Sequence, residues 1–254
     1  MKPPRLLILN VTVNPLSITE LNHYISESID CQKCWIIAHH NLHSVYLYQR
    51  DIKMRMFYKR ADIVHIDGMP LVYWARLLGY PVSREQRVTY VDWVHPLLAL
   101  AAYEGWRVFY LGGKPGVAAR AAERLRCQYP SLIIGTHHGY FRSDENDTVL
   151  ATIADFRPHI LMVGMGMPRQ EYWILDNLDR IRANAILTAG ACFDYIAGEI
   201  PTPPRWMGRM GLEWLYRLIS EPRRLGRRYL VEPWSLLPLM IKDIQTRFLQ
   251  RHRI

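Results

Sequence analysis

The sequence predicts an α/β protein with a parallel, doubly wound sheet flanked by helices and a helical C-terminal appendage. Short apolar runs, typical of buried strands, alternate with stretches of helical period over most of the chain. Half of the 254 residues are hydrophobic, which is enough for a sizeable core. The composition changes near a proline-rich segment at residues 201–204, so we separate a domain of residues 1–204 from an appendage of residues 205–254.

The expected elements follow in chain order. Apolar runs predict strands at residues 6–11, 34–38, 62–66, 106–111, 132–135, 159–163 and 185–189. Helical periodicity predicts helices at residues 42–60, 69–78, 90–103, 117–128, 144–156 and 171–178. Ser17 and Glu20 have the spacing of a capping box, which starts a helix that ends near residue 29. In the appendage we expect helices at residues 207–220 and 233–250, with a break at Pro222.

The loop Gly-Met-Gly-Met-Pro-Arg-Gln-Glu, residues 164–171, lies between a predicted strand and a predicted helix. Gly164 and Gly166 permit close approach of the backbone to a ligand, and Pro168 suits the first turn of a helix. The free N–H groups at a helix start favour a phosphate, and Gln170 supplies an oriented polar group. The loop is neither a G-x-G-x-x-G fingerprint nor a P-loop, so an ordinary strand-to-helix turn is an equal alternative.

Residues that follow the strands are the candidate site residues, because open α/β sheets bind ligands at the carboxyl ends of their strands. They are His39, Asn41, Asp67, Gly112, Gly113, Tyr140, Gly166, Gln170 and Asp194. Asp67 is the candidate general base, since a carboxylate there can take a proton from a sugar hydroxyl. Its alternative role is the N-cap of the helix at residue 69. Asp194 is a candidate ribose contact, and Tyr140 either stacks on a flat base or belongs to the core.

Arg87 lies at a loop-to-helix junction, where two interpretations are open. Its guanidinium group binds a diphosphate or an acceptor, or it forms a surface ion pair with Glu85 or Asp92, which would contribute little.

The appendage carries eleven basic and four acidic side chains, which indicates an anionic partner or a solvated charged face. Arg217, Arg224 and Arg227 share a helix face if the helix resumes after the proline, and guanidinium groups suit phosphate. Trp206, Trp214 and Trp234 suit a membrane interface. We expect an arm that docks on a membrane and binds a lipid diphosphate. Nucleic acid is the competing partner, but no helix-turn-helix or zinc pattern supports it.

The cysteine pattern and the apolar segments set the expected compartment. Cys31-x-x-Cys34 has no second Cys or His pair at metal-binding spacing, so we expect no metal site. There is neither a signal-peptide pattern nor an apolar run long enough to span a membrane. We expect a cytoplasmic protein.

Five motifs stand in a fixed order between about residues 35 and 230. They are Asp-Ile-Val-His-Ile-Asp-Gly at 62–68, Leu-Gly-Gly-Lys-Pro-Gly at 111–116, Gly-Tyr-Phe at 139–141, the loop at 164–171, and Gly-Leu-Glu-Trp-Leu-Tyr-Arg at 211–217 with Glu-Pro-Arg-Arg at 221–224. Together they resemble the WecG/TagA/CpsF family of glycosyltransferases.

The resemblance implies a Rossmann-like, inverting transferase peripheral on the inner face of the cytoplasmic membrane. It would move a hexose or N-acetylhexosamine from a UDP-sugar to a polyprenyl diphosphate-linked sugar in bacterial surface glycan or exopolysaccharide synthesis. Asp67 would be the general base, and Asn41 and Gln170 would line the sugar pocket. Tyr140 and Asp194 would hold the nucleoside.

The resemblance also assigns the appendage and the cofactors. Arg217, Arg224 and Arg227 would reach the diphosphate and neutralise the leaving UDP. The chain lacks an Asp-x-Asp motif, so we expect neither a metal nor another cofactor. Association into a homo-oligomer stays open.

The chain departs from the family pattern at His39, where many members have threonine. The imidazole is a replacement hydrogen-bond donor to the sugar, a proton relay or a passive substitution. Two other functions are alternatives to the transferase: a Rossmann-type oxidoreductase, which the absent dinucleotide fingerprint disfavours, and a nucleic-acid-binding module.

Overall fold

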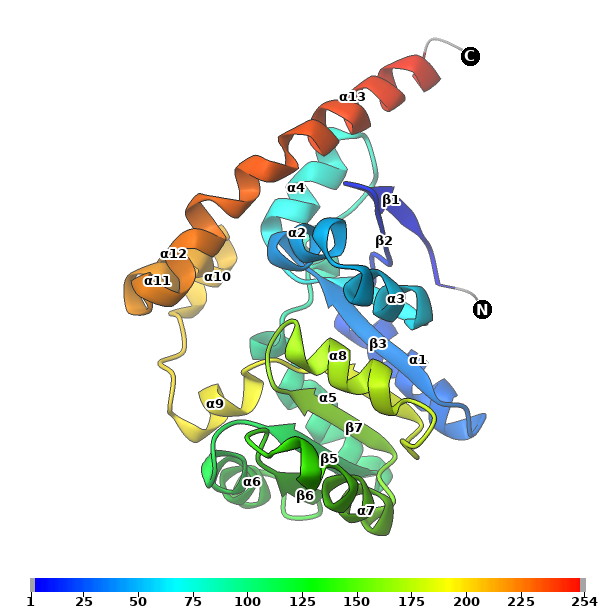
Figure 1. Ribbon diagram of the computed structural model, residues 1–254, viewed down its shortest axis with the longest axis vertical. Coiled ribbons are helices and arrows are strands. Elements are labelled where there is room, and N and C mark those ends of the chain that lie inside the picture. The colour runs from blue at the N-terminus through cyan, green and yellow to red at the C-terminus, as the bar shows by residue number, and fades with distance from the viewer. Residues whose placement is uncertain (1–2, 252–254) are drawn as a thin grey trace.

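The computed structural model describes residues 3–251, and its centre is a six-stranded parallel sheet with helices on both faces (Figure 1). The spatial order of the strands is β4-β3-β8-β7-β5-β6, and each neighbouring pair is parallel. Their bounds in this order are Ile63–Ile66, Trp35–His40, Ala185–Thr188, Ile160–Gly164, Arg107–Gly112 and Ile133–His137. The parallel α/β fold predicted from the sequence is confirmed.

Two hydrophobic clusters hold the helices on the two faces of the sheet. One cluster joins the sheet to α1 (Ile18–Asp30), α5 (Tyr90–Glu104), α6 (Val117–Gln128) and α9 (Cys192–Ala197). The other joins it to α3 (Ile52–Arg60), α7 (Asn146–Phe156) and α8 (Arg169–Asn177). Strand β5 shows the alternation, because Val108 and Tyr110 pack in the first cluster and Phe109 and Leu111 in the second.

The capping box of α1 is present as expected. The Glu20 backbone N–H donates to Ser17 Oγ at 3.3 Å, and the Ser17 N–H donates to Glu20 Oε2 at 2.7 Å. Two short 3-10 turns, η1 (Arg84–Gln86) and η2 (Ser143–Glu145), precede α5 and α7.

The prediction of one strand at residues 6–11 is wrong, because this segment begins an antiparallel hairpin. Strands β1 (Leu6–Ile8) and β2 (Val11–Val13) are joined at Leu9 and Asn10, whose φ angles are 50° and 61°. The hairpin packs with α2 (Leu42–Arg50) and α4 (Met69–Leu77) in a third hydrophobic cluster. Apolar residues continue on both sides of the turn, so the hydrophobic pattern of the sequence does not reveal it.

The prediction of a single helix at residues 42–60 is also wrong. Asp51 has an extended backbone, φ −122° and ψ 119°, and it separates α2 from α3. Its Oδ1 accepts hydrogen bonds from the N–H groups of Lys53 at 2.7 Å and Met54 at 3.1 Å. Such a cap stabilises a new helix start and ends the previous helix.

The appendage contains α10 (Arg205–Met210), α11 (Glu213–Ser220), α12 (Pro222–Leu230), the 3-10 turn η3 (Glu232–Leu236) and α13 (Leu237–Arg251). The break at Pro222 is confirmed, whereas the single helix expected at 207–220 is divided by Gly211, which has a φ of +74°. These helices lie along one side of the sheet, and α13 extends away from it (Figure 1). Asp243 on α13 accepts hydrogen bonds from Leu9 N at 2.7 Å and Trp74 Nε1 at 2.9 Å.

Candidate active site

The candidate general base lies where two neighbouring strands end. In β3 and β4, His39 pairs with His65, and the Asp67 N–H donates to the His40 carbonyl oxygen at 2.8 Å. This register brings Asn41, the N-cap of α2, beside Asp67. The N-cap of α4 is Gly68, with φ +126° and no capping side chain, so the alternative that Asp67 caps this helix is wrong. The carboxylate is therefore available for other contacts.

Asp67 has polar contacts with two of the predicted residues. Asn41 Nδ2 donates to Asp67 Oδ2 at 3.1 Å, and His39 Nε2 lies 3.7 Å from the same oxygen. His39 Nδ1 lies 3.1 Å from Thr188 Oγ1, so β8 orients the imidazole. The Asp67 side chain is 26% exposed, whereas that of His39 is 7% exposed. Asp67 thus combines a fixed position with access to a cavity.

The charge state of this cluster follows from burial and neighbours. Burial raises the pKa of Asp67, but His39, the Asn41 amide, His65 and Arg87 outweigh it and hold that pKa below its ordinary value. Burial lowers the pKa of His39, and it lowers that of His65 to about 3. We conclude that Asp67 is ionised and both imidazoles are neutral at pH 7, which suits a carboxylate base.

A cavity of about 240 Å³ opens beside Asp67 between the sheet and the appendage. The sheet domain contributes, among others, Asn41, His43, Asp67, Met69 and Arg87. The appendage contributes Gly211, Glu213, Trp214, Arg217, Arg228, Tyr229 and Pro233. The site is therefore built from segments more than 100 residues apart in the chain, and α11, α12 and η3 close it.

Arg87 is a buried link between these two parts of the chain. Its Nη2 lies 2.9 Å from Asp92 Oδ2 and its Nη1 lies 3.0 Å from Glu213 Oε2. The expected pairing with Asp92 is thus found. Arg87 is only 8% exposed, whereas the Asp92 side chain is 42% exposed, so the pair lies at the edge of the buried region. Arg87 is therefore a structural link between the core and α11.

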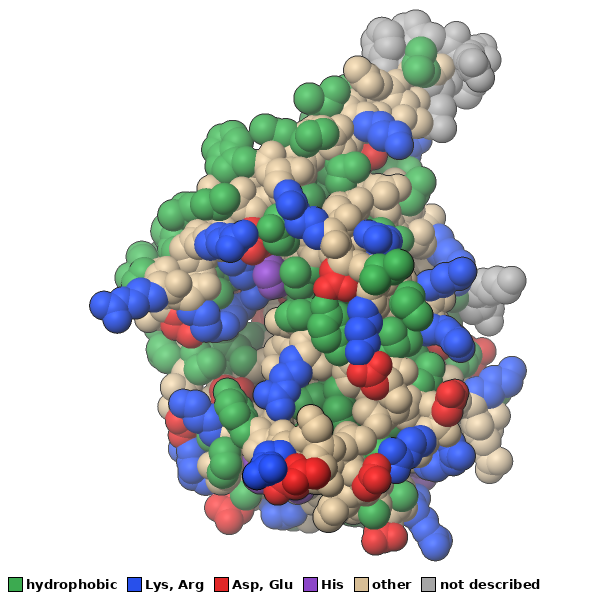
Figure 2. Space-filling view, in the orientation of Figure 1, with side chains coloured by type: hydrophobic (Ala, Val, Ile, Leu, Met, Phe, Trp, Pro, Cys, Tyr) green, Lys and Arg blue, Asp and Glu red, His purple; other side chains and the backbone are tan. Residues whose placement is uncertain are grey.

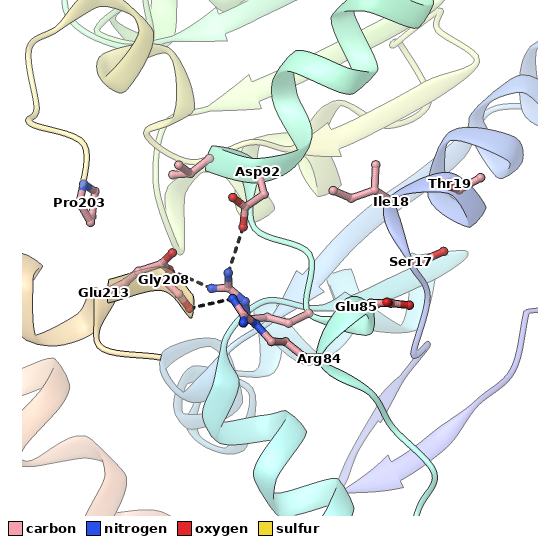
Figure 3. Close-up of a pocket in the computed structure, with 11 residues that line it drawn as sticks. Ser17, Ile18, Thr19, Arg84, Glu85, Asp92, Pro203, Gly208 and Glu213 are labelled. Atoms are coloured by element: carbon pink, nitrogen blue, oxygen red, sulfur yellow. Dashed lines mark hydrogen bonds and ion pairs between the residues drawn. The ribbon is translucent and has the colours of Figure 1, made fainter. Parts of the chain in front are cut away.

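The Arg87–Glu213 pair also separates two cavities. Both residues line the cavity at Asp67 and a larger one of about 670 Å³ near Ser17 and Arg84. In Figure 3, dashed lines join Asp92 and Glu213 to a guanidinium group in the middle of the view. The larger cavity carries charges of both signs and lacks Asp67.

Gln170 and Glu171 begin α8 and are fully buried. Gln170 Nε2 donates to Glu171 Oε1 at 2.8 Å, and the Gly190 N–H donates to Gln170 Oε1 at 3.1 Å. Gln170 thus joins α8 to the loop after β8, and it does not line the 240 Å³ cavity. Glu171 Oε2 has no hydrogen-bond partner among residues 3–251, and burial raises the Glu171 pKa to about 7.

A second group of predicted residues lies at the other half of the sheet. Gly112 ends β5 and Gly113 follows it, and a Cβ on Gly112 would lie 2.3 Å from the Gly164 carbonyl oxygen. Gly166 has a φ of +76°. The two loops therefore approach each other in a way that only glycine permits.

Tyr140 and Asp194 belong to the same half. Tyr140 is 61% exposed, so the alternative that it is a core residue is wrong. Burial and Glu199 raise the pKa of Asp194, while Lys114 and Arg224 lower it. Tyr140 is thus exposed, whereas Asp194 is half-buried in the first turn of α9.

The three predicted arginines of the appendage have different environments. Arg217 lines the cavity at Asp67. Arg224 is exposed and makes two hydrogen bonds to Glu221, at 2.5 and 2.6 Å, and Arg227 is exposed. Arg228 also lines the cavity, although it was not among the predicted site residues. The prediction placed the three arginines on one continuous helix face, but the break at Glu221 between α11 and α12 changes the direction in which the α12 side chains point.

This combination of fold and site defines a class of protein. An α/β sheet with an ionised carboxylate at its strand ends, and arginines supplied by a second segment, suits group transfer between anionic substrates. A sequence model of the glycosyl transferase WecG/TagA/CpsF family matches residues 6–250, and the chain belongs to this family. It is thus a glycosyltransferase of cell-surface polysaccharide synthesis. The match favours this activity over the oxidoreductase and the nucleic-acid-binding module.

Among residues 3–251, no helix is both long enough and apolar enough to cross a bilayer.

Proposed function

We propose that the protein is an inverting glycosyltransferase that moves a hexose or N-acetylhexosamine from a UDP-sugar to a polyprenyl diphosphate-linked sugar. The observation that carries this proposal is the position of Asp67 in a cavity that the arginine-bearing appendage closes. Family membership supports glycosyl transfer and surface-polysaccharide synthesis, and the site supports the finer assignments.

In the proposed reaction, Asp67 takes the proton of the acceptor hydroxyl as that oxygen attacks the anomeric carbon. The new C–O bond forms on the face opposite UDP, and the bond to the diphosphate oxygen breaks with its electron pair, so the configuration inverts. Asn41, hydrogen-bonded to Asp67 at 3.1 Å, holds the carboxylate in place. A positioned general base of this kind typically contributes about 10²–10⁴-fold in rate.

The donor is assigned to the glycine-rich half of the site. Tyr140 and Asp194 would hold the nucleoside, while Gly112, Gly113 and Gly166 would let the backbone approach the diphosphate. Gln170 and His39 would orient the sugar of the donor. Gln170 would act through the loop after β8, to which it is hydrogen-bonded, and His39 would act through its contact with Asp67. In this scheme residues 1–204 form the catalytic domain and residues 205–254 complete it.

The leaving group would be stabilised by an arginine rather than by a metal ion. Arg224 of the appendage, whose charge lowers the pKa of Asp194, is assigned to this role, and the sequence has no Asp-x-Asp motif. We expect turnover to be unchanged by EDTA. Turnover that EDTA abolishes and Mg²⁺ restores would contradict this part of the proposal.

The appendage is proposed to place the enzyme on the inner face of the cytoplasmic membrane. Its helices carry exposed large apolar side chains, which Figure 2 shows gathered along one edge of the molecule. They include Trp206, Met210, Ile219, Val231, Trp234 and Ile241. Basic side chains interleave with them, a combination that suits an anionic lipid surface.

The test is UDP release with a panel of UDP-sugars and a short-chain polyprenyl diphosphate-sugar acceptor. Acceptor-dependent turnover is expected for the wild type, and we expect Asp67→Asn to lower it at least about 100-fold. Asp155→Asn, which changes an exposed carboxylate on α7, is the matched control and should leave turnover unchanged. Full activity of Asp67→Asn would refute the base assignment, and no turnover with any donor would contradict the proposed reaction.

A further inference from the structure

Two arginine side chains in the cavity at Asp67 lack an anionic partner. Arg217 on α11 and Arg228 on α12 both line the cavity. The Nε atom of each is enclosed, and neither guanidinium group forms a hydrogen bond or ion pair with another of residues 3–251. Arg87, by contrast, has two carboxylate partners in the same region.

An enclosed N–H group without a partner is costly, because it loses water and gains no hydrogen bond in return. Burial lowers the pKa of Arg228, and the neighbouring Arg217 adds to this effect. Tyr229 and the carboxylates of Asp67 and Glu232 oppose it, but only in part. Arg217 differs, because Tyr195, Tyr229 and the carboxylates of Asp67 and Glu221 outweigh burial and raise its pKa. Arg228 is therefore the less compensated of these two cations, and a bound anion would stabilise it.

The side chain of Arg228 is held in place by its surroundings. Leu225, one turn earlier in α12, is 1% exposed and anchors the helix on the core. The Arg228 guanidinium group lies 5.7 Å from the centroid of the Tyr229 ring. Glu232, the nearest carboxylate in the chain after Arg228, is paired with His43 Nδ1 at 2.6 Å. Glu232 is therefore occupied, and the donors of Arg228 stay available.

We propose that Arg228 is a phosphate-binding residue and that, with Arg217, it holds the diphosphate of the acceptor beside Asp67. This inference rests on the proposed function, and it adds a residue that the motif argument did not single out. Guanidinium groups bind phosphate oxygens in a bidentate manner, so two of them match the two phosphates of a diphosphate.

The cavity favours the acceptor over the donor as the source of the diphosphate. It contains Asp67, which acts on the acceptor hydroxyl, and it has apolar walls from Trp214 and Pro233. The glycines of the nucleoside half do not line it.

Arg227 provides a matched comparison because it is the preceding residue of the same helix. Successive residues of an α-helix point about 100° apart, so one of the two faces solvent when the other faces the cavity. Arg227 is exposed, whereas Arg228 is half-buried and lines the cavity. Exchanging either arginine for glutamine removes the same charge from the same helix.

The test measures the binding of farnesyl diphosphate by titration calorimetry in the absence of any UDP-sugar. We expect Arg228→Gln to weaken Kd at least about tenfold, about 1.4 kcal/mol, and Arg227→Gln to change it less than about twofold. Arg228→Lys should restore part of the affinity, since it keeps the charge and loses the fork. Farnesyl monophosphate should be less sensitive to Arg228→Gln, and Kd for UDP should be unchanged.

Three outcomes would overturn the inference. They are no binding of farnesyl diphosphate by the wild type, an equal loss in Arg227→Gln, and a loss that affects UDP instead. We expect Arg228→Gln to have a thermal denaturation midpoint at or above that of the wild type. The substitution removes the Arg228 charge and its enclosed Nε–H group, which has no hydrogen-bond partner among residues 3–251. Because binding is measured without transfer, failure of the proposed reaction and failure of this assignment give different results.

Discussion

The buried carboxylate of Glu171 should make the stability of this protein depend on pH in a defined direction. Glu171 is fully buried, and its Oε2 has no partner among the described residues. Burial raises its pKa from 4.5 to about 7, against the opposing hydrogen bond from Gln170. The folded state therefore binds the Glu171 proton more tightly than the unfolded state does.

The magnitude follows from these two pKa values. A rise from 4.5 to about 7 corresponds to about 3 kcal/mol of stability. This contribution is fully present below about pH 4.5, where both states are protonated, and it is lost as the pH rises through about 7. The wild type should thus lose about 2–3 kcal/mol between about pH 5 and pH 8 relative to a variant that cannot titrate there.

The assay compares the wild type with Glu171→Gln by urea denaturation at several pH values. Tryptophan fluorescence is the signal that reports unfolding. Contributions of the buried histidines cancel in the difference, because both proteins contain them. Glu123→Gln, at an exposed position of α6, is the control for removing a surface carboxylate. We expect Glu171→Gln to gain relative stability steadily toward pH 8. A difference that is the same at every pH, or one that favours the wild type at high pH, would refute the reasoning.

Two further predictions concern packing and membrane contact. Gly112→Ala should lower the free energy of unfolding by about 1–3 kcal/mol, because its Cβ would meet the Gly164 carbonyl oxygen at 2.3 Å. Gly226→Ala, in open space within α12, should instead raise it by up to about 1 kcal/mol, and urea denaturation measures both. Trp234→Ser should weaken cosedimentation with anionic vesicles about tenfold, since this side chain is 69% exposed on the appendage. Tyr103→Ser, at an 85% exposed residue of α5, should leave vesicle binding unchanged, and equal losses in both variants would contradict a docking role for the appendage.

Local rules predicted most elements and failed at two kinds of position. The capping box at Ser17 and the strand at residues 159–163 were predictable, since each depends on residues close in the chain. Hydrophobic periodicity did not predict the hairpin turn at Asn10 or the helix break at Asp51, because apolar spacing continues across both. Asp51 is a good N-cap, and this signal could have revealed the break.

The candidate site shows the same division. The sequence alone predicted that Asp67 and Asn41 lie at the same edge of the sheet, because polar residues directly after buried parallel strands must lie there. It was also sufficient for the family, because the motifs are local runs of residues.

Only the tertiary structure decided which arginine faces the cavity, and that Arg87 is buried against Asp92 and Glu213. The contact between Arg87 and Glu213 joins residues more than 100 positions apart, and the break before Pro222 sets the direction of α12. Side-chain direction after such a break depends on how Leu225 and Leu236 pack on the core. Packing between distant segments is a property of the folded chain, and no spacing within the sequence contains it.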